Sequence, residues 1–152
     1  MRALKEKEFT KIKVIKDDTE TKSQNGLVSS ISINDTEYTL GECYLPVTAS
    51  FKIHYYYLKI KIGQTANALV KNKNYQEVVE ELEELGFSNI KLQRANDIGW
   101  FPIHDPEGSI KTLKINDSGD FTEEDVFNYD DEIIIVVHTR DTGCEDITEV
   151  AE

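Results

Sequence analysis

Carboxylates in the loops of the second half of the chain are the first residues whose chemistry has to be weighed. Five aspartates stand in segments rich in turn-forming residues: Asp97, Asp105, Asp117, Asp120 and Asp125. Two carboxylates can act as general acid and general base only when the environment raises the pKa of one of them. No spacing in this set specifies such a pair. The sequence therefore predicts no catalytic residue, and we expect that the protein is not an enzyme.

The acidic segment from Asp117 to Asp125 also offers oxygen atoms to a calcium ion. However, its glycine and its glutamates stand at the wrong positions for the EF-hand loop pattern. A solvated turn at residues 116–119, Asn-Asp-Ser-Gly, explains the same residues. We therefore expect neither a metal site nor a cofactor.

Histidine and cysteine give no stronger signal. His54 stands beside three tyrosines in a predicted strand and His138 follows an apolar run, so we expect both to be structural. Cys43 and Cys144 lie far apart, outside any CxxC or zinc-site spacing with a histidine. A disulfide between them is left open. The sequence has no nucleophile elbow, phosphate-binding loop or HExxH motif.

Aromatic side chains are the best candidates for contacts with a ligand. Tyr55 and Tyr57 flank Tyr56 in a predicted strand, so their rings point to the face opposite that of Tyr56. Trp100 and Phe101 stand in a loop bordered by glycine and proline. Exposed rings beside polar groups suit sugars, peptides or protein interfaces. Our ligand-binding candidates are therefore Trp100, Phe101, Tyr55 and Tyr57, although the two loop rings could instead cover the core as a lid.

The charge of the chain excludes two classes of partner. Its 152 residues carry 29 acidic and 17 basic side chains, a formal net charge of −12. Binding to nucleic acid or to anionic lipid needs a basic surface, so we expect neither. Residues 1–70 hold 10 basic and 8 acidic side chains, whereas residues 71–152 hold 7 and 21. No run of 18 apolar residues occurs, so no membrane span is predicted within the sequence.

A capped amphipathic helix is the clearest element in the sequence. Asn74 can cap its start, and Glu77 can complete a capping box. Gly86 is placed to end it. Apolar residues recur on one face at helical spacing: Tyr75, Val78, Val79, Leu82 and Leu85.

Strands are predicted on the C-terminal side of this helix. Residues 87–92 and 111–115 alternate between apolar and polar side chains. Residues 133–137 are five consecutive apolar β-formers, which is typical of a strand covered on both faces. The order of elements in residues 70–140 is thus an extended lead, a helix and three strands.

An internal repeat relates the two halves of the chain. Three segments of the first half match three of the second, in the same order and at a nearly constant offset: 9–14 with 87–92, 26–35 with 108–117, and 51–57 with 133–139. Ordered matches of this kind indicate a duplicated structural unit.

The first copy has no counterpart for the helix, because that counterpart would begin before residue 1 and only residues 3–7 could form its last turn. We expect either a naturally short unit or a fragment of a longer protein, and favour the fragment. The predicted fold is α+β, with a helix packed on a small sheet in each unit and the first unit lacking its helix. The predicted domains are residues 1–62, residues 63–140 and a disordered acidic tail at 141–152.

Residues 71–90, from Lys71 through the helix to Ile90, resemble the opening of PASTA-like repeats, in particular divergent repeats in uncharacterised proteins of Firmicutes. In that family an extended lead enters an amphipathic helix, the helix ends in glycine and an apolar residue, and a strand follows. The hydrophobic last strand at 133–137 also matches. The resemblance covers residues 70–139 well and 3–59 in part. The usual Val-Pro start is absent, and residues 114–120 replace the usual Gln-x-Pro-x-x-Gly.

The resemblance implies two tandem PASTA-like units that act as a non-catalytic binding or spacer module outside the cytoplasm. Its partner would be cell-wall glycopeptide or a protein. The open helix slot of the first unit could be filled by N-terminal residues, by the second unit, or by a second copy in a homodimer. The alternative is a cytosolic interaction domain whose acidic second half binds a basic protein.

Overall fold

The computed structural model describes residues 4, 7–38, 41, 44–98 and 106–140. By its internal contacts the chain divides into two compact units, Met1–Leu58 and Lys59–Glu152. The predicted acidic tail, Cys43, Cys144, Trp100 and Phe101 all lie outside the described residues. No helix in the described part of the chain is long and apolar enough to cross a membrane.

The helix of the second unit, α3 (Tyr75–Leu85), has the predicted ends. The side chain of Asn74 accepts a hydrogen bond from the backbone N–H of Gln76, and Glu77 Oε2 accepts one from the Asn74 N–H at 2.9 Å. At the other end Gly86 adopts a left-handed conformation with φ 111°, and the Phe87 N–H donates to the carbonyl of Leu82. Both the predicted capping box and the glycine stop are confirmed.

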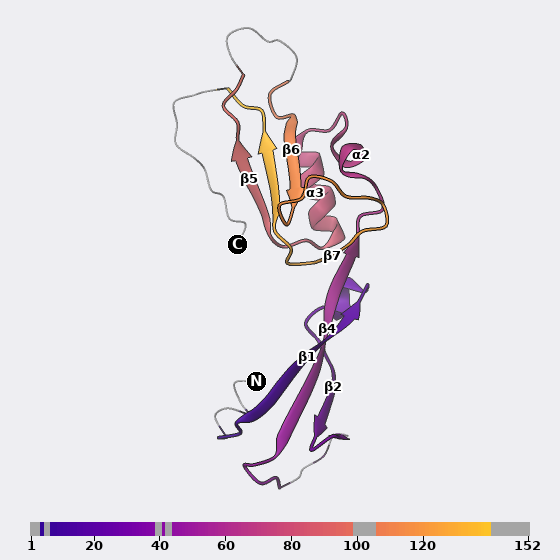
Figure 1. Cartoon of the computed structure of the whole chain (residues 1–152), viewed down its shortest axis with the longest axis vertical. Coiled ribbons are helices and arrows are strands. Elements are labelled where there is room, and N and C mark those ends of the chain that lie inside the picture. The colour runs from indigo at the N-terminus through magenta and orange to yellow at the C-terminus, as the bar shows by residue number, and fades with distance from the viewer. Residues whose placement is uncertain (1–3, 5–6, 39–40, 42–43, 99–105, 141–152) are drawn as a thin grey trace. The chain divides into compact units, whose positions relative to one another are not determined.

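Three strands form the sheet of the second unit: β5 (Ile90–Arg94), β6 (Ile110–Ile115) and β8 (Ile133–Val137). β8 is central, parallel to β5 and antiparallel to β6. Helix α3 covers one face of this sheet (Figure 1), and its fully buried Val78 and Leu82 belong to the same core as Ile133 and Ile135. The helix-on-sheet arrangement is confirmed here.

The sheet differs from the prediction in two details. β5 begins at Ile90, later than the predicted residue 87, because the backbone and side chain of Ser88 instead donate to the Tyr129 carbonyl in a loop. In β8 the alternate residues Ile134 and Val136 are half-buried, so the second face is only partly covered.

Two short elements in the second unit were not predicted. The segment between β4 and α3 contains α2 (Ala66–Val70), which is capped by Thr65 and buries Leu69 completely. A strand of three residues, β7 (Val126–Asn128), pairs with residues 59–61 of β4. Both elements are too short for apolar periodicity to reveal them.

The first unit is a sheet with the strand order β1-β4-β2-β3. Its elements are β1 (Lys11–Thr19), the 3-10 helix η1 (Lys22–Gln24), β2 (Val28–Ile33), β3 (Thr36–Glu37) and β4 (Ser50–Lys61). β4 runs parallel to β1 and antiparallel to β2, and it continues past the unit boundary at Leu58. The described residues between 7 and 58 form no α-helix. The predicted α+β class is therefore confirmed. Among the described residues before residue 7, Leu4 is helical, so the predicted lack of a helix in the first unit stays a prediction.

The parallel pairings of the two units correspond to one another. Ile12 of β1 pairs with Phe51 of β4, and the residues that match them in sequence, Ile90 and Ile133, pair between β5 and β8.

The antiparallel pairings correspond as well. β2 and β6 each carry a bulge at matched positions, between residues 28 and 30 and between residues 110 and 112. Each strand then ends in an Asn-Asp turn whose two residues have positive φ: Asn34 and Asp35 in one, Asn116 and Asp117 in the other. The three sequence matches therefore lie at equivalent places in the two sheets.

Candidate functional site

The described tyrosines among the predicted ligand-binding residues lie on β4. Tyr57 is 6% exposed, its ring meets that of Tyr55 edge-on at 6.3 Å, and the Lys16 ammonium lies 3.5 Å from its ring centre. Tyr55 is half-buried and lines a groove. Of the pair, Tyr55 is thus the ring that a ligand could reach in this structure.

This first-unit groove has a volume of about 1050 Å³. Its lining is mostly apolar and includes Leu4, Phe9, Ile31, Phe51, Ile53 and Tyr55. Phe9 closes one end, with its ring 4.8 Å from that of Phe51. Its polar groups are those of Lys7 and of the tyrosines Tyr38, Tyr44 and Tyr55. A mostly apolar groove of this kind suits another protein segment better than a sugar.

A second hollow of about 530 Å³ lies in the second unit, where α3 begins and where β5 and β8 end. We call it the helix-start pocket. Leu92 and Val137 supply apolar surface. The other side chains of the lining carry polar groups: Asn74, Tyr75, Gln76, Gln93, Arg94, Glu107, Thr139 and Arg140. Arg140 also forms an ion pair with Glu107 at 3.7 Å. Amide and guanidinium groups around an apolar surface can bind a ligand that carries hydroxyls and a carboxylate.

Close packing between Gly108 and Asn74 forms one wall of this pocket. Gly108 has φ 87°, and a Cβ atom there would lie 2.6 Å from Asn74 Nδ2. The Tyr75 N–H donates to the Gly108 carbonyl at 3.0 Å. These contacts attach the start of α3 to the segment that enters β6.

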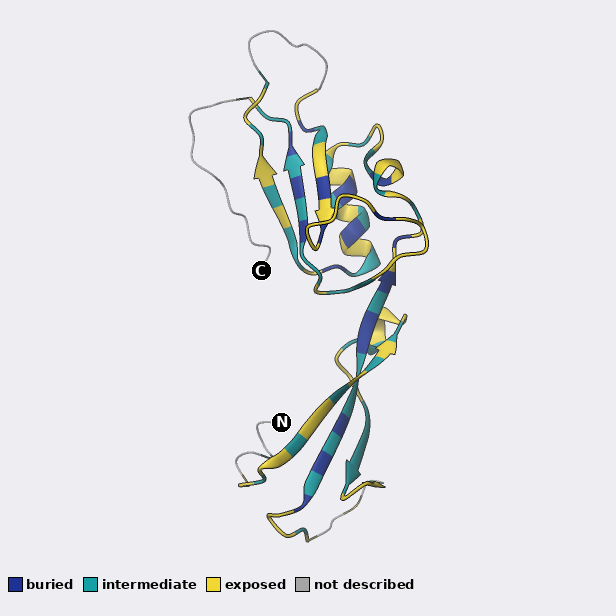
Figure 2. Cartoon of the chain, in the orientation of Figure 1, coloured by how far each residue is buried: buried dark blue, intermediate teal, exposed yellow. Residues whose placement is uncertain are grey.

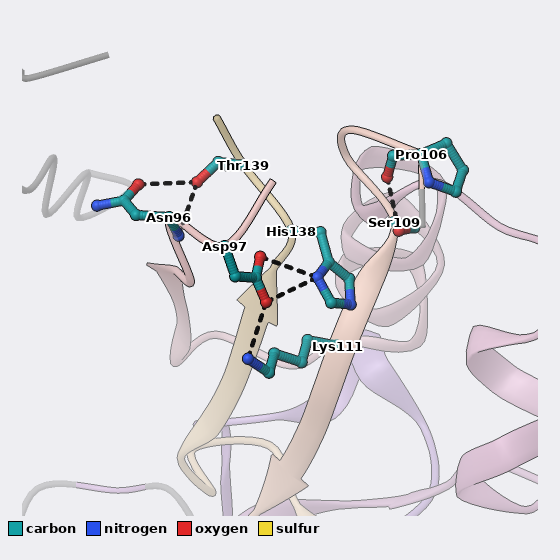
Figure 3. A network of polar contacts seen from close by, with 7 residues as sticks. All are labelled: Asn96, Asp97, Pro106, Ser109, Lys111, His138 and Thr139. Carbon is teal, nitrogen blue, oxygen red and sulfur yellow. Dashed lines mark hydrogen bonds and ion pairs between the residues drawn. The ribbon is translucent and has the colours of Figure 1, made fainter. Parts of the chain in front are cut away.

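A polar network joins the segments that follow β5 and β8 (Figure 3). The Asp97 carboxylate lies between Lys111 Nζ, at 2.8 Å, and His138 Nδ1, at 3.0 Å. These hydrogen bonds, that of Lys111 first and that of His138 second, hold the pKa of Asp97 below its usual value. Asn96 and Thr139 add a further contact between the same segments. His138 therefore has a structural partner, as the sequence predicted.

The first unit has a comparable pair. Asp17 accepts hydrogen bonds from Ser29 Oγ at 2.6 Å and from His54 Nδ1 at 3.0 Å, and these two contacts lower its pKa. Ser29 donates to the carboxylate, so this contact does not prepare its hydroxyl to act as a nucleophile through the histidine.

The residues considered for calcium are engaged in local turns. Asp125 Oδ2 accepts hydrogen bonds from the backbone N–H and the hydroxyl of Thr122, and Ser118 bonds to the backbone of Asp120. Within the described residues, no three side chains of His, Cys, Asp or Glu come together as metal ligands.

Sequence reasoning missed the residues of the helix-start pocket. Arg94 ends β5 and Arg140 closely follows β8, and the carboxyl ends of adjacent parallel strands meet at one edge of a sheet. That signal was available once the two strands were assigned as parallel neighbours. The predicted Trp100 and Phe101 lie outside the described residues, so their role stays a prediction.

Comparisons with known proteins give little further help. No protein-family model matches the chain, and no curated protein matches it in sequence. One solved structure that it resembles is the entire extracellular region of the Ser/Thr kinase PrkC from Staphylococcus aureus, with 15% identity and a TM-score of 0.38. The similarity covers 95% of this chain and 43% of that one, so this chain spans less than half of its length. So low a TM-score does not establish a common arrangement.

Proposed function

We propose that this protein is a non-catalytic binding or spacer module that acts outside the cytoplasm, and that its ligand is cell-wall glycopeptide or a protein. The helix-start pocket is the observation that carries this proposal. Its apolar surface at Leu92 and Val137 can hold a sugar ring or a small side chain. Arg94 and Arg140 stand beside that surface and can bind the carboxylates of a short peptide.

The corresponding strand pairings support the proposal that the chain consists of two tandem PASTA-like units, at residues 1–62 and 63–140. The resemblance in residues 71–90 supports the same reading. A module of this kind binds through its loops and needs no reactive side chain. The predicted Trp100 and Phe101 stand between β5 and β6 in the sequence, and their part in binding stays a proposal.

Retention on purified peptidoglycan tests this function. We expect the chain to be retained, and the double variant Arg94→Ala, Arg140→Ala to bind at least about tenfold more weakly, because it loses two charge-assisted contacts. Trp100→Ala should also weaken retention. Lys114→Ala, which removes a positive charge from an exposed position outside the pocket, is the control and should bind normally. A chain that no wall preparation retains would rule out the wall ligand.

The acidic outer surface of α3 favours a second candidate function. Glu77, Glu80, Glu83 and Glu84 are all exposed on this helix. We propose as the alternative a cytosolic interaction domain that binds a basic protein through this surface. Such binding would weaken strongly as salt screens the charges. Binding that is unchanged between low and high salt would exclude it.

A further inference from the structure

We propose that the first-unit groove is the seat of an amphipathic α-helix that ends at Leu4–Phe9 and occupies the place that α3 has in the second unit. This proposal is independent of the helix-start pocket. The helix that fills the groove would be continuous with the chain at Leu4 and would not come from a second copy of the protein.

The exposure of matched residues shows what the groove lacks. In the second unit Leu113 and Ile115 are 6% and 2% exposed under α3. The residues that match them in the first unit, Ile31 and Ile33, are only half-buried, and Val28 on the same strand is 56% exposed. Figure 2 shows the buried stripe that α3 contributes in the second unit. Phe51 and Ile53 of β4, which pair with Ile33 and Ile31, are 5% and 8% exposed, so among the described residues the less covered apolar surface of this face lies along β2.

The turn before β1 has the form of a helix end. The Phe87 N–H donates to the Leu82 carbonyl at the end of α3, and in the first unit the Phe9 N–H donates to the Leu4 carbonyl at 3.3 Å. Glu8 has φ 64°, a left-handed conformation that corresponds to that of Gly86. Leu4 and Leu82, Glu8 and Gly86, and Phe9 and Phe87 are separated by the same number of residues as the matched strand residues Ile12 and Ile90. Leu4, Glu8 and Phe9 thus have the hydrogen bond and the left-handed residue that end a helix.

The place for the start of the helix is open. Gly108 packs against Asn74, the residue that caps α3, whereas a Cβ atom at the matching Gly26 would meet no atom within 4 Å. Leu4 and Phe9 line the groove at its other end. A helix that ends at Leu4 would therefore lie across the apolar face and place its cap against Gly26. The residue matching Val78 falls one position before Met1.

The test supplies this helix to the full chain. The sequence of residues 71–79 is placed before Arg2, so that it replaces Met1 and continues into residues 2–9. We expect ANS fluorescence to fall by at least half and amide exchange in β2 and in residues 50–58 of β4 to slow. The midpoint of unfolding of the first unit should rise by roughly 5–10 °C, because two apolar side chains become buried.

The matched control carries the same extension with its copy of Val78 changed to Asp, and it should leave all three readouts at their original values. Equal effects of the two extensions, or no effect of either, would overturn the proposal. Sedimentation distinguishes the second-copy alternative. If the original chain forms a dimer that the extension does not dissociate, a second copy fills the groove and the proposal is wrong. Retention on peptidoglycan through the helix-start pocket should be the same for both extended chains.

Discussion

The sheets of the two units have equivalent pairings but different cover. In the second unit α3 lies over the sheet, and Ile115, Ile133 and Ile135 are at most 2% exposed. In the first unit the corresponding positions hold Ile33, which is half-buried, and Phe51 and Ile53, which are 5% and 8% exposed. No α-helix lies within described residues 7–38, 41 and 44–58. The pairing of strands is therefore independent of the helix, because alternation and the Asn-Asp turns are sufficient to set it.

Aromatic residues explain how the first sheet holds together without a cover. Phe51, Tyr55 and Tyr57 stand where the second unit has Ile133, Val137 and Thr139. Their larger rings contact other rings: Phe51 meets Phe9, which precedes β1, and Tyr55 meets Tyr57 on β4. Each such pair adds about 0.5–1.5 kcal/mol beyond the area that it buries.

The largest loss of stability that we predict comes from a substitution in α3, the helix that covers the second sheet. Leu82→Ala should lower the free energy of unfolding of the second unit by about 2–5 kcal/mol, because it leaves a cavity in a fully buried site. Urea denaturation with hydrogen exchange as the unit-specific readout measures this. Glu80→Ala, on the exposed side of the same helix, is the control. A loss no larger than that of the control would contradict the packing of α3 on the sheet.

A matched pair of core substitutions compares the sheets directly. Ile115→Ala should cost about 2–4 kcal/mol, and Ile33→Ala about 1 kcal/mol, because Ile33 already contacts solvent. The same denaturation experiment measures both variants. Equal losses would mean that the first sheet is covered in solution as fully as the second.

A matched pair of glycines should show a smaller difference. Gly26→Ala should cost about 1 kcal/mol, because φ is positive at this position. Gly108→Ala carries the same strain and also displaces the side chain of Asn74, which adds the loss of a helix cap, about 1 kcal/mol more. Thermal unfolding of both variants measures the difference. Identical shifts would show that the contact with Asn74 does not stabilise the unit.

The smallest effect concerns pH. The pKa of Asp97 is lowered by Lys111 and His138, so its stabilising effect is complete above its ordinary pKa of 3.8 and is lost as pH falls through the lower folded value. Asp97→Asn should therefore be less stable than the original chain at pH 7, and the two should converge below pH 3.8. Thermal midpoints across this range measure the difference. A gap that stays constant down to pH 2 would contradict this account.

Features that depend only on neighbouring residues, such as helix ends and turns, were predicted from the sequence. The Asn74 cap, the Gly86 stop and the Asn-Asp turn at residues 116–117 each depend on neighbouring residues, and each is present. α2 and β7 could not be predicted, because they form through contacts with distant residues such as the end of β4. The helix-start pocket could not be predicted from motifs, because its residues come together only when β5 and β8 pair side by side.

In both units the strand that pairs with two flanking strands is synthesised after both of them. β4 follows β1 and β2, and β8 follows β5 and β6, whereas the flanking strands never pair with each other. A nascent chain that stops before residue 133 therefore has two strands with exposed hydrogen-bonding edges and no partner between them. Each sheet closes in a single late step over a long separation in sequence, so truncation by a few C-terminal residues of β8 should be far more damaging than a cut of equal length in β5.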